Sequence, residues 1–349
     1  MLSLAFLTGA LRARGGLTVG RLTGVTVEAQ WRANSGATVA RLALGYDAAA
    51  PISSPRRVVA KIAEGDALDP SRRELRFYRL IAPSIPEGLA PRLFGAAVGL
   101  EEGKIVLLFE DLLESGYVQA IGPLTKVDLE TLVDRMAALH AVFWGKSWPP
   151  ELDFSAPMTS STRSAQAAPL AVVEDNARTG NEAMSAFLSR YQAQLSLQEE
   201  AVLTGVQSRW HDDMAARSCA GHLTLIHGDF HLAGNIFLRD DAPPRVIDWS
   251  EMKPGLGPHD LAYALISQPV ENRVARDLVL LERYHAALET SGVTGYSWDQ
   301  CLWDYRFSLV TNLFQSARQS NLIWMRKTLA AIADHDATAS ILAQKPGLF

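Results

Sequence analysis

The sequence predicts an α+β fold with two lobes: a small β-rich lobe over residues 1–112 and a larger, mainly helical lobe over 113–349. Strand-like alternation dominates residues 17–112, and helical periodicity dominates most of the rest. A chain of 349 residues is long enough for both lobes to bury a core. Polar residues also follow short apolar runs near 226 and 247, where a rigid scaffold commonly holds catalytic groups.

The composition is that of an ordinary folded protein, with 48% hydrophobic and 20% charged residues. The net charge is −5 and the basic residues do not cluster, which argues against a nucleic-acid partner. The two cysteines, Cys219 and Cys301, lack the spacing of a metal site. A reduced, cytoplasmic setting is therefore expected, while one disulfide between them stays open.

The N-terminal residues are apolar first and basic afterwards. This order is wrong for a signal peptide. Leu4, Leu7 and Leu11 share one helical face, which predicts a short helix that docks on the protein. No apolar run reaches the length of a transmembrane helix, so no membrane association is expected.

Residues 17–46 show β-type alternation on both sides of Asn34-Ser35-Gly36, which predicts a hairpin. The backbone amides near Ser35 and Gly36 could bind phosphate groups. The sequence contains neither G-x-G-x-x-G nor a Walker motif, so an ordinary hairpin turn is an equal alternative.

Lys61 is the one lysine in a short buried-type strand, Arg57-Val58-Val59-Ala60-Lys61-Ile62, and a lysine is unusual there. The following segment predicts a helix, with Asp69 as its cap and Pro70 in its first turn. Its periodicity places Glu74 on the inner face. A Lys61–Glu74 ion pair is therefore expected; the alternative is a lysine that extends to solvent from an edge strand.

Two strands over 97–109 predict a second hairpin that ends in Glu110-Asp111-Leu112. Thr125 and Asp128 have capping-box spacing ahead of a helix that reaches Phe143, in which His140 is expected to be a hydrogen-bonded core residue. Residues 155–180 lack a period and predict a surface excursion, whereas 181–215 and 276–337 are helical in pattern.

The candidate chemistry lies in His227-Gly228-Asp229, Asn235 and Asp248. Carboxylate and amide oxygens are the ligands that Mg²⁺ prefers, and an aspartate can also accept the proton of a hydroxyl. Asp248 stands between Ile247 and Trp249, where an unpaired carboxylate would be costly. An isolated His-Gly-Asp can also be a tight turn, but together the two motifs favour phosphoryl transfer.

These motifs resemble the aminoglycoside phosphotransferase and choline kinase superfamily, which shares the protein-kinase fold. The run I-D-W-S-E-M-K-P-G-L-G-P-H-D-L-A-Y at 247–263 most resembles the ecdysteroid-kinase-like branch. The resemblance implies that Asp229 is the catalytic base, that Asn235 and Asp248 bind Mg²⁺, and that Asp260 supports the catalytic loop. In the family the asparagine follows the aspartate by five residues, whereas Asn235 follows Asp229 by six. A bulge at 233–234 would absorb the extra residue, since glycine permits it.

The resemblance also implies how a nucleotide is bound. Lys61, oriented by Glu74, would contact the α and β phosphates of ATP, and the hairpin at Ser35 and Gly36 would cover them. Residues 110–114, including Glu110 and Leu112, would form the hinge that binds adenine.

The predicted function is ATP-dependent phosphorylation of a hydroxyl on a small molecule. Because the C-terminal half carries many aromatic residues and few clustered acids, a neutral or apolar alcohol is the expected acceptor. The alternatives are an aminoglycoside or choline-type amino-alcohol kinase and a non-catalytic nucleotide-binding module on the same fold.

Overall fold

The computed structural model describes residues 2–33, 35–99, 103–146, 152, 170–218 and 222–339. The chain divides into two compact units, Met1–Ile121 with Ala233–Ser250, and Gly122–Leu232 with Glu251–Phe349. The predicted division into lobes near residue 112 stays a prediction; by its contacts, the segment 233–250 clusters with the first unit. The reason is strand pairing, because β8 (Ile236–Arg239) joins β6 (Val118–Gln119) and β9 (Ala242–Val246) in a three-stranded sheet.

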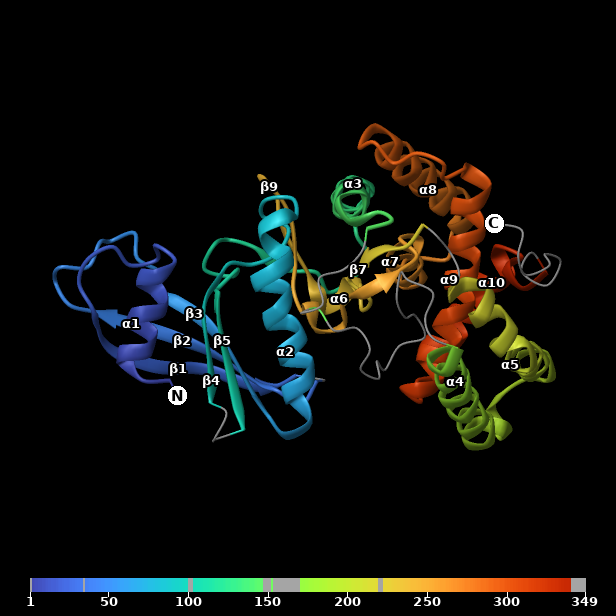
Figure 1. Cartoon of the computed structure of the whole chain (residues 1–349), viewed down its shortest axis with the longest axis horizontal. Coiled ribbons are helices and arrows are strands. Elements are labelled where there is room, and N and C mark those ends of the chain that lie inside the picture. The colour runs from blue at the N-terminus through green and yellow to red at the C-terminus, as the bar shows by residue number, and fades with distance from the viewer. Residues whose placement is uncertain are drawn as a thin grey trace. The chain divides into compact units, whose positions relative to one another are not determined.

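The first unit is built on a five-stranded antiparallel sheet in the order β1-β2-β3-β5-β4 (Figure 1). Its strands are β1 (Leu22–Arg32), β2 (Thr38–Tyr46), β3 (Arg57–Glu64), β4 (Leu93–Gly99) and β5 (Lys104–Glu110). Both predicted hairpins are present, β1 with β2 and β4 with β5. Asn34 and residues 100–102 of their turns lie outside the described residues.

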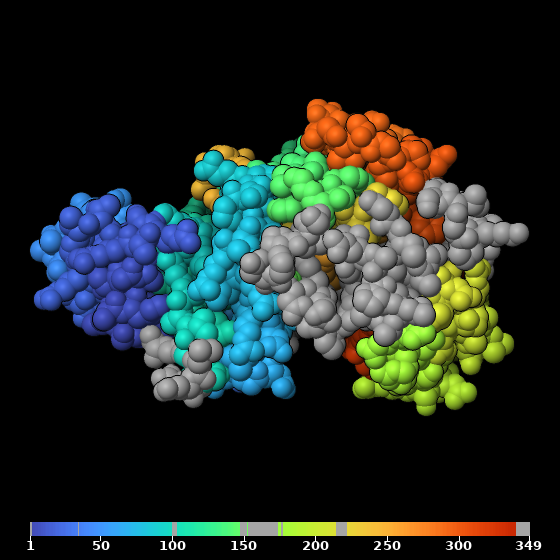
Figure 2. Space-filling model, viewed as in Figure 1, coloured from blue at the N-terminus to red at the C-terminus, as the bar shows by residue number. Residues whose placement is uncertain are grey.

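The N-terminal helix α1 (Leu4–Ala13) packs on this sheet, as its apolar face predicted. Leu7 and Leu11 are fully buried in a core shared with Val58 of β3 and Leu108 of β5. The hydroxyl of Ser3 caps the helix by accepting from the backbone N–H of Phe6. In Figure 1, α1 lies across the strands, and in Figure 2 its dark-blue outer side forms part of the surface of this unit.

The helix after β3 begins differently from the prediction. A 3₁₀ turn, η1 (Gly65–Ala67), runs directly into α2 (Leu68–Arg76), with the N–H of Leu68 bonded to the carbonyl of Gly65. A backbone turn therefore replaces the predicted Asp69 cap, and Asp69 forms an ion pair with Arg72. The helix continues as a π turn, η2 (Phe77–Ile81), followed by η3 (Ala82–Ser84).

The second unit is mainly helical. Its helices are α3 (Lys126–Phe143), α4 (Leu170–Tyr191), α5 (Leu197–Ser218), α7 (Pro258–Ile266), α8 (Arg273–Thr290), α9 (Trp298–Arg318) and α10 (Leu322–Asp334). Thr125 caps α3 as predicted. Part of the predicted excursion is helical, since α4 begins at Leu170; residues 155–169 lie outside the described part.

A two-stranded antiparallel sheet, β7 (Thr224–Ile226) with β10 (Lys253–Gly255), supports the loop that carries Asp229. Among the described helices, none is long and apolar enough to cross a membrane. The α+β prediction, with an N-terminal antiparallel sheet and a helical C-terminal part, is confirmed.

Candidate active site

Lys61 of β3 makes two short ion pairs within the first unit. Its Nζ lies 2.7 Å from Oε2 of Glu74 on α2 and 2.8 Å from Oδ1 of Asp248. We refer to Lys61, Glu74 and Asp248 as the Lys61 cluster. Lys61 cannot be an edge-strand lysine, because β3 pairs with β2 on one side and with β5 on the other. The ion pair predicted from the strand and helix patterns is therefore present, and Asp248 joins it.

Burial and neighbouring charges shift the pKa of Lys61 in opposite directions. Lys61 and Glu74 are 7% and 2% exposed. Burial alone would lower the pKa of Lys61, but the charges of Glu74 and Asp248 outweigh burial and raise it above the ordinary value. Lys61 is thus a fixed ammonium ion whose position is set by two carboxylates, which suits a group that neutralises phosphate.

Asp248 adopts a left-handed backbone conformation, with φ of +61°, which is uncommon outside glycine. Its neighbours hold it there. Trp249 stacks on Phe77 of η2 with ring centroids 4.1 Å apart. Ser250 Oγ donates to Asp248 Oδ1 at 2.9 Å. The strain at Asp248 is consistent with a functional residue that its surroundings hold in place.

Asn235 closes an interrupted turn, α6 (Leu232–Asn235). The backbone leaves helical geometry at Ala233 and Gly234, where ψ is 95° and φ is +126°, respectively. This is where the extra residue was expected to bulge. Gln119 Nε2 donates to the Gly234 carbonyl at 2.6 Å, and the N–H of Ile247 donates to the Asn235 carbonyl at 2.9 Å. The backbone of Asn235 therefore lies beside the residue that precedes Asp248.

Asp229 lies in the second unit, three residues after β7, in a loop of residues 227–231 that we call the Asp229 loop. The buried carboxylate of Asp260 accepts the backbone N–H groups of His227 at 2.7 Å and Gly228 at 3.0 Å. Gly228 has φ of +82°, and a Cβ there would collide with the Glu251 carbonyl and Lys253. The loop conformation thus requires both a glycine and a buried acceptor.

Asp260 is in turn held by His140 of α3. His140 Nε2 lies 3.3 Å from Asp260 Oδ2, and its Nδ1 lies 2.8 Å from the hydroxyl of Tyr284. Burial would raise the pKa of Asp260, but the hydrogen bond with His140 and the electrostatic effect of the neighbouring histidines together outweigh burial and lower it. Both predictions are confirmed: His140 is a hydrogen-bonded core histidine, and Asp260 supports the loop.

Sequence reasoning missed Tyr263, which lies one helical turn after Asp260 on α7. Gln315 Nε2 of α9 donates to its hydroxyl at 3.3 Å, and burial together with the charge of Asp229 raises the pKa of Tyr263. The signal was available, since residues three apart in a helix share a face and Asp260 was already assigned to the loop. Ser250 was also missed, because its contact with Asp248 depends on the backbone turn between them.

The remaining predicted residues lie in turns or, for Glu110, at the end of a strand. The N–H of Gly36 donates to the Ala33 carbonyl, so the turn itself uses this amide. Ser35 is half-buried, and its hydroxyl has no partner among the described residues. The Leu112 carbonyl accepts the N–H of Tyr117. Glu110 ends β5 and lies 3.5 Å from Arg245. These contacts describe ordinary turns and leave the predicted nucleotide roles as expectations.

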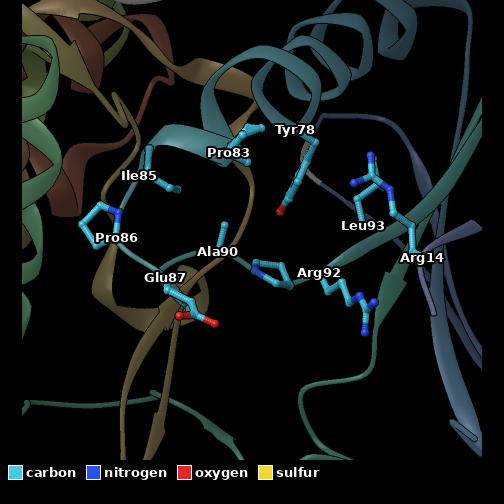
Figure 3. A pocket seen from close by; sticks show the side chains of 12 residues that line it. Arg14, Tyr78, Pro83, Ile85, Pro86, Glu87, Ala90, Arg92 and Leu93 are labelled. Atoms are coloured by element: carbon cyan, nitrogen blue, oxygen red, sulfur yellow. The ribbon is translucent and has the colours of Figure 1, made fainter. Parts of the chain in front are cut away.

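The first unit also contains a separate cavity of about 360 Å³. It lies between the end of α1, the η2 and η3 turns and the segment that leads into β4 (Figure 3). Arg14, Tyr78, Glu87 and Arg92 are its polar lining residues, and prolines and alanines supply much of the rest. None of the predicted site residues lines this cavity.

Comparison with known proteins places this geometry in a family. A search of curated protein sequences finds no significant match. Among solved structures, the chain is similar to wild-type aminoglycoside 2'-phosphotransferase-IIIa in its GDP complex, with 13% identity, a TM-score of 0.53 and coverage of 97% of this chain and 100% of that one. It is also similar to a thermostable mutant of the aminoglycoside phosphotransferase APH(4)-Ia in a ternary complex with ADP and hygromycin B, with 14% identity, a TM-score of 0.50 and coverage of 97% and 99%.

A third similar structure is macrolide 2'-phosphotransferase MphH from Brachybacterium faecium, with 17% identity, a TM-score of 0.47 and coverage of 93% and 96%. The model of the phosphotransferase enzyme family matches residues 33–298, which is more than half of the chain. The matched range contains the Lys61 cluster and the Asp229 loop. The chain therefore belongs to the phosphotransferase enzyme family and is a small-molecule phosphotransferase.

Proposed function

We propose that this protein transfers the γ-phosphoryl group of ATP to the hydroxyl of a neutral or largely apolar alcohol, and that it belongs to the ecdysteroid-kinase-like branch. The observation that carries the proposal is the Lys61 cluster, in which one buried ammonium is fixed by Glu74 and Asp248. A lysine fixed between two carboxylates resembles the kinase arrangement that orients a lysine on the α and β phosphates.

The donor side of the reaction follows from the residues around Lys61. The side-chain oxygens of Asp248 and Asn235 are of the kind that Mg²⁺ selects, and two protein ligands suffice for an ion that also binds phosphates. When bound, Mg²⁺ would neutralise charge on the phosphates. In the same proposal the turn at Ser35 and Gly36 covers the nucleotide. Residues 110–114, including Glu110 and Leu112, form its hinge between a nucleotide-binding lobe and a catalytic lobe.

The acceptor side follows from Asp229. The proton of the acceptor hydroxyl passes to the Asp229 carboxylate, the hydroxyl oxygen bonds to the γ phosphorus, and the bond between γ phosphorus and bridging oxygen breaks to release ADP. Asp260 holds the backbone of this loop, so Asp229 is pre-positioned.

The neutral acceptor is favoured by the side chains near Asp229 in the second unit. His231, Tyr263 and Trp324 contact one another through their rings, with centroids 5.2–6.2 Å apart. Asp304, which could have attracted a polycation, is 2% exposed and engaged by His222 and Tyr296. Aromatic surroundings with few available acids suit an apolar acceptor.

Aminoglycoside modification is the second candidate, because two of the solved structures above are aminoglycoside enzymes. A choline-type acceptor is a variant of this candidate, since one cation can sit on an aromatic face. A cytoplasmic setting belongs to the proposal as well, since it supplies ATP and keeps the buried Cys301 thiol reduced.

An acceptor screen tests the proposal. ATP consumption and phosphorus-31 NMR of the products would be measured with neutral hydrophobic alcohols, choline-type amines and kanamycin-type amines. Phosphate-ester formation with neutral alcohols supports the proposal. Turnover confined to the polyamine class contradicts the acceptor, and nucleotide binding without turnover of any compound favours the non-catalytic module.

A further inference from the structure

The cavity in the first unit contains a buried hydroxyl that has no hydrogen-bond partner among the described residues. Tyr78 of η2 lines this cavity and is 6% exposed, and its phenol oxygen is the unpartnered group. In Figure 3 this oxygen points into the cavity. A buried tyrosine hydroxyl usually has a partner, because leaving it without one costs free energy. A partner for Tyr78 would therefore lie in the cavity.

The ring of Tyr78 is held by its neighbours. It packs edge-on against Phe77, with ring centroids 5.0 Å apart, and tilted against Phe109 of β5, with centroids 5.1 Å apart. The turn that carries Tyr78, η2, is π-helical, and such turns are frequent at functional sites. The hydroxyl therefore keeps its direction and can donate to an acceptor in the cavity.

Two arginines, Arg14 and Arg92, line the same cavity, and neither forms an ion pair with another described residue. The guanidinium of Arg92 lies over the ring of Phe94 in β4, 5.4 Å from its centroid. A Cβ on Gly15, the residue after Arg14, would lie 3.6 Å from Nη2 of Arg92. The fold thus brings the Arg92 guanidinium next to the chain at Arg14. Two such charges without a neighbouring carboxylate create a positive potential that attracts an anion.

The other side of the cavity is largely apolar. Figure 3 shows Arg14 and Arg92 on one side. Ile85 and Pro86 lie on the opposite side, together with Glu87, the one carboxylate among the described lining residues. Two arginines and one glutamate give the lining a net charge of +1, with the positive charge at one end. The volume of about 360 Å³ falls in the lower part of the range for small-molecule sites.

We propose that this cavity binds a small organic anion, a carboxylate or a phosphate ester on an apolar body. The anionic oxygens accept hydrogen bonds from Arg14, Arg92 and the Tyr78 hydroxyl, since guanidinium groups match both kinds of anion. The apolar body lies against Ile85 and Pro86. A single bound water would satisfy the hydroxyl but would not neutralise the two arginines. None of the lining residues belongs to the Lys61 cluster or the Asp229 loop, so the proposal does not depend on the proposed function.

The unpartnered hydroxyl can be tested without a ligand. Tyr78→Phe removes a group that has no partner, so its midpoint of urea denaturation should equal that of the parent or lie slightly above it. Tyr46→Phe is the matched control, because the Tyr46 hydroxyl donates to the Pro55 carbonyl at 2.6 Å, and its midpoint should fall. An equal fall in both variants would show that the Tyr78 hydroxyl is already satisfied in the free protein, which overturns the proposal.

Binding is measured on the full chain labelled with carbon-13 at tyrosine Cζ, with the Tyr78 resonance assigned by its loss in Tyr78→Phe. The probes are benzoate, hexanoate and phenyl phosphate. Benzyl alcohol keeps an apolar body without the charge, and inorganic phosphate keeps the charge without the body. We expect at least one organic anion to shift the Tyr78 resonance with a Kd of about 1 mM or lower, and both control compounds to bind at least about tenfold more weakly.

The pattern of binding identifies the anion. Binding of benzoate and hexanoate alone assigns a carboxylate, and binding of phenyl phosphate alone assigns a phosphate ester; either result supports the proposal. No shift with any organic anion at about 10 mM overturns it. Equal binding of benzyl alcohol or of inorganic phosphate also overturns it, because the site would then select only an apolar body or only a charge.

Variants separate this cavity from other places where an anion could bind. Arg14→Gln and Arg92→Gln should each raise the Kd of the best anion at least about fivefold. Arg32→Gln, at an exposed arginine of β1 outside the lining, and Lys61→Ala should stay within about twofold of the parent. The shift of the Tyr78 resonance is followed at constant ionic strength, because salt screens exposed charges. Unchanged affinity in both cavity variants, or an equal loss in Lys61→Ala, overturns the proposal.

Discussion

Around Lys61, charged side chains hold one another; around Asp229, a buried carboxylate holds the backbone. Lys61 meets Glu74 and Asp248 at 2.7 and 2.8 Å, so its position depends on a balance of charge. The conformation of the Asp229 loop depends on the left-handed backbone of Gly228 and on the two N–H groups that donate to Asp260. Changes in the Lys61 cluster should therefore alter nucleotide binding, whereas changes in the Asp229 loop should alter chemistry or folding.

The largest expected effect is in the Asp229 loop. Asp229→Asn should lower kcat about 10³-fold, because the amide cannot accept the proton of the acceptor hydroxyl. KM for ATP should stay close to that of the parent. Steady-state kinetics with the best alcohol of the screen measure both, with Asp240→Asn as a control at an exposed position. Retained chemistry with lost nucleotide binding would contradict the assigned role.

In the first unit, loss of one proposed metal ligand should lower activity more than loss of the other. Asp248→Ala removes a carboxylate and one partner of Lys61, so activity should fall about 100-fold or more. Asn235→Ala removes a neutral oxygen at the end of a bulge and should cost about tenfold. Activity measured across a Mg²⁺ titration checks this order. If Asn235→Ala keeps the parent's Mg²⁺ dependence, Asn235 is not a ligand.

Asp260→Ala tests whether the Asp229 loop is held by the hydrogen bonds that its backbone N–H groups donate to Asp260. It leaves two buried N–H groups without their acceptor and should lower the free energy of unfolding by about 3 kcal/mol. Asp260→Asn keeps one carbonyl acceptor and should cost less. Urea denaturation measures both variants. Equal stability of parent and Asp260→Ala would show that the loop keeps its conformation without this contact.

The lowered pKa of Asp260 predicts that the stability of the protein depends modestly on pH. The pKa of Asp260 is lowered in the folded protein, so the unfolded chain binds this proton more readily. The stabilisation is therefore fully present above the unfolded value of about 3.9 and is lost as the pH falls through the lower folded value. The stability difference between the parent and Asp260→Asn should shrink as the pH is lowered below about 4. A difference that stays constant with pH would show that the charge is not responsible.

Local sequence predicted much of the Lys61 cluster and less of its surroundings. Strand and helix periods placed Lys61 and Glu74 on facing sides of neighbouring elements. The contact between Lys61 and Asp248 joins residues 187 positions apart and needs a left-handed aspartate, which no local pattern signals. The predicted Asp69 cap was wrong because a backbone turn started α2 instead.

In the Asp229 loop, too, some features were predicted from the sequence and others were not. The His-Gly-Asp motif was read from residue types, whereas the bulge at 233–234 and the supporting Asp260 were implied by the family resemblance. The position of Tyr263 was not predicted, because it depends on how α7 packs and on the hydrogen bond that Gln315 of α9 donates to the Tyr263 hydroxyl. Assignment of residues 233–250 to one unit likewise depended on pairing between β6 and β8, which are far apart in sequence.

Nucleotide affinity tests the contrast between the two regions most directly. Calorimetric titration with Mg²⁺ and a non-hydrolysable ATP analogue would compare the parent with Lys61→Ala and Asp229→Asn. Lys104→Ala serves as control, since Lys104 is a strand lysine paired with Glu64 and 41% exposed in its side chain. We predict that Lys61→Ala raises Kd at least about tenfold, a loss of about 1.4 kcal/mol, and that Asp229→Asn and Lys104→Ala stay within about twofold of the parent. Unchanged affinity in Lys61→Ala, or a comparable loss in Asp229→Asn, would contradict the account.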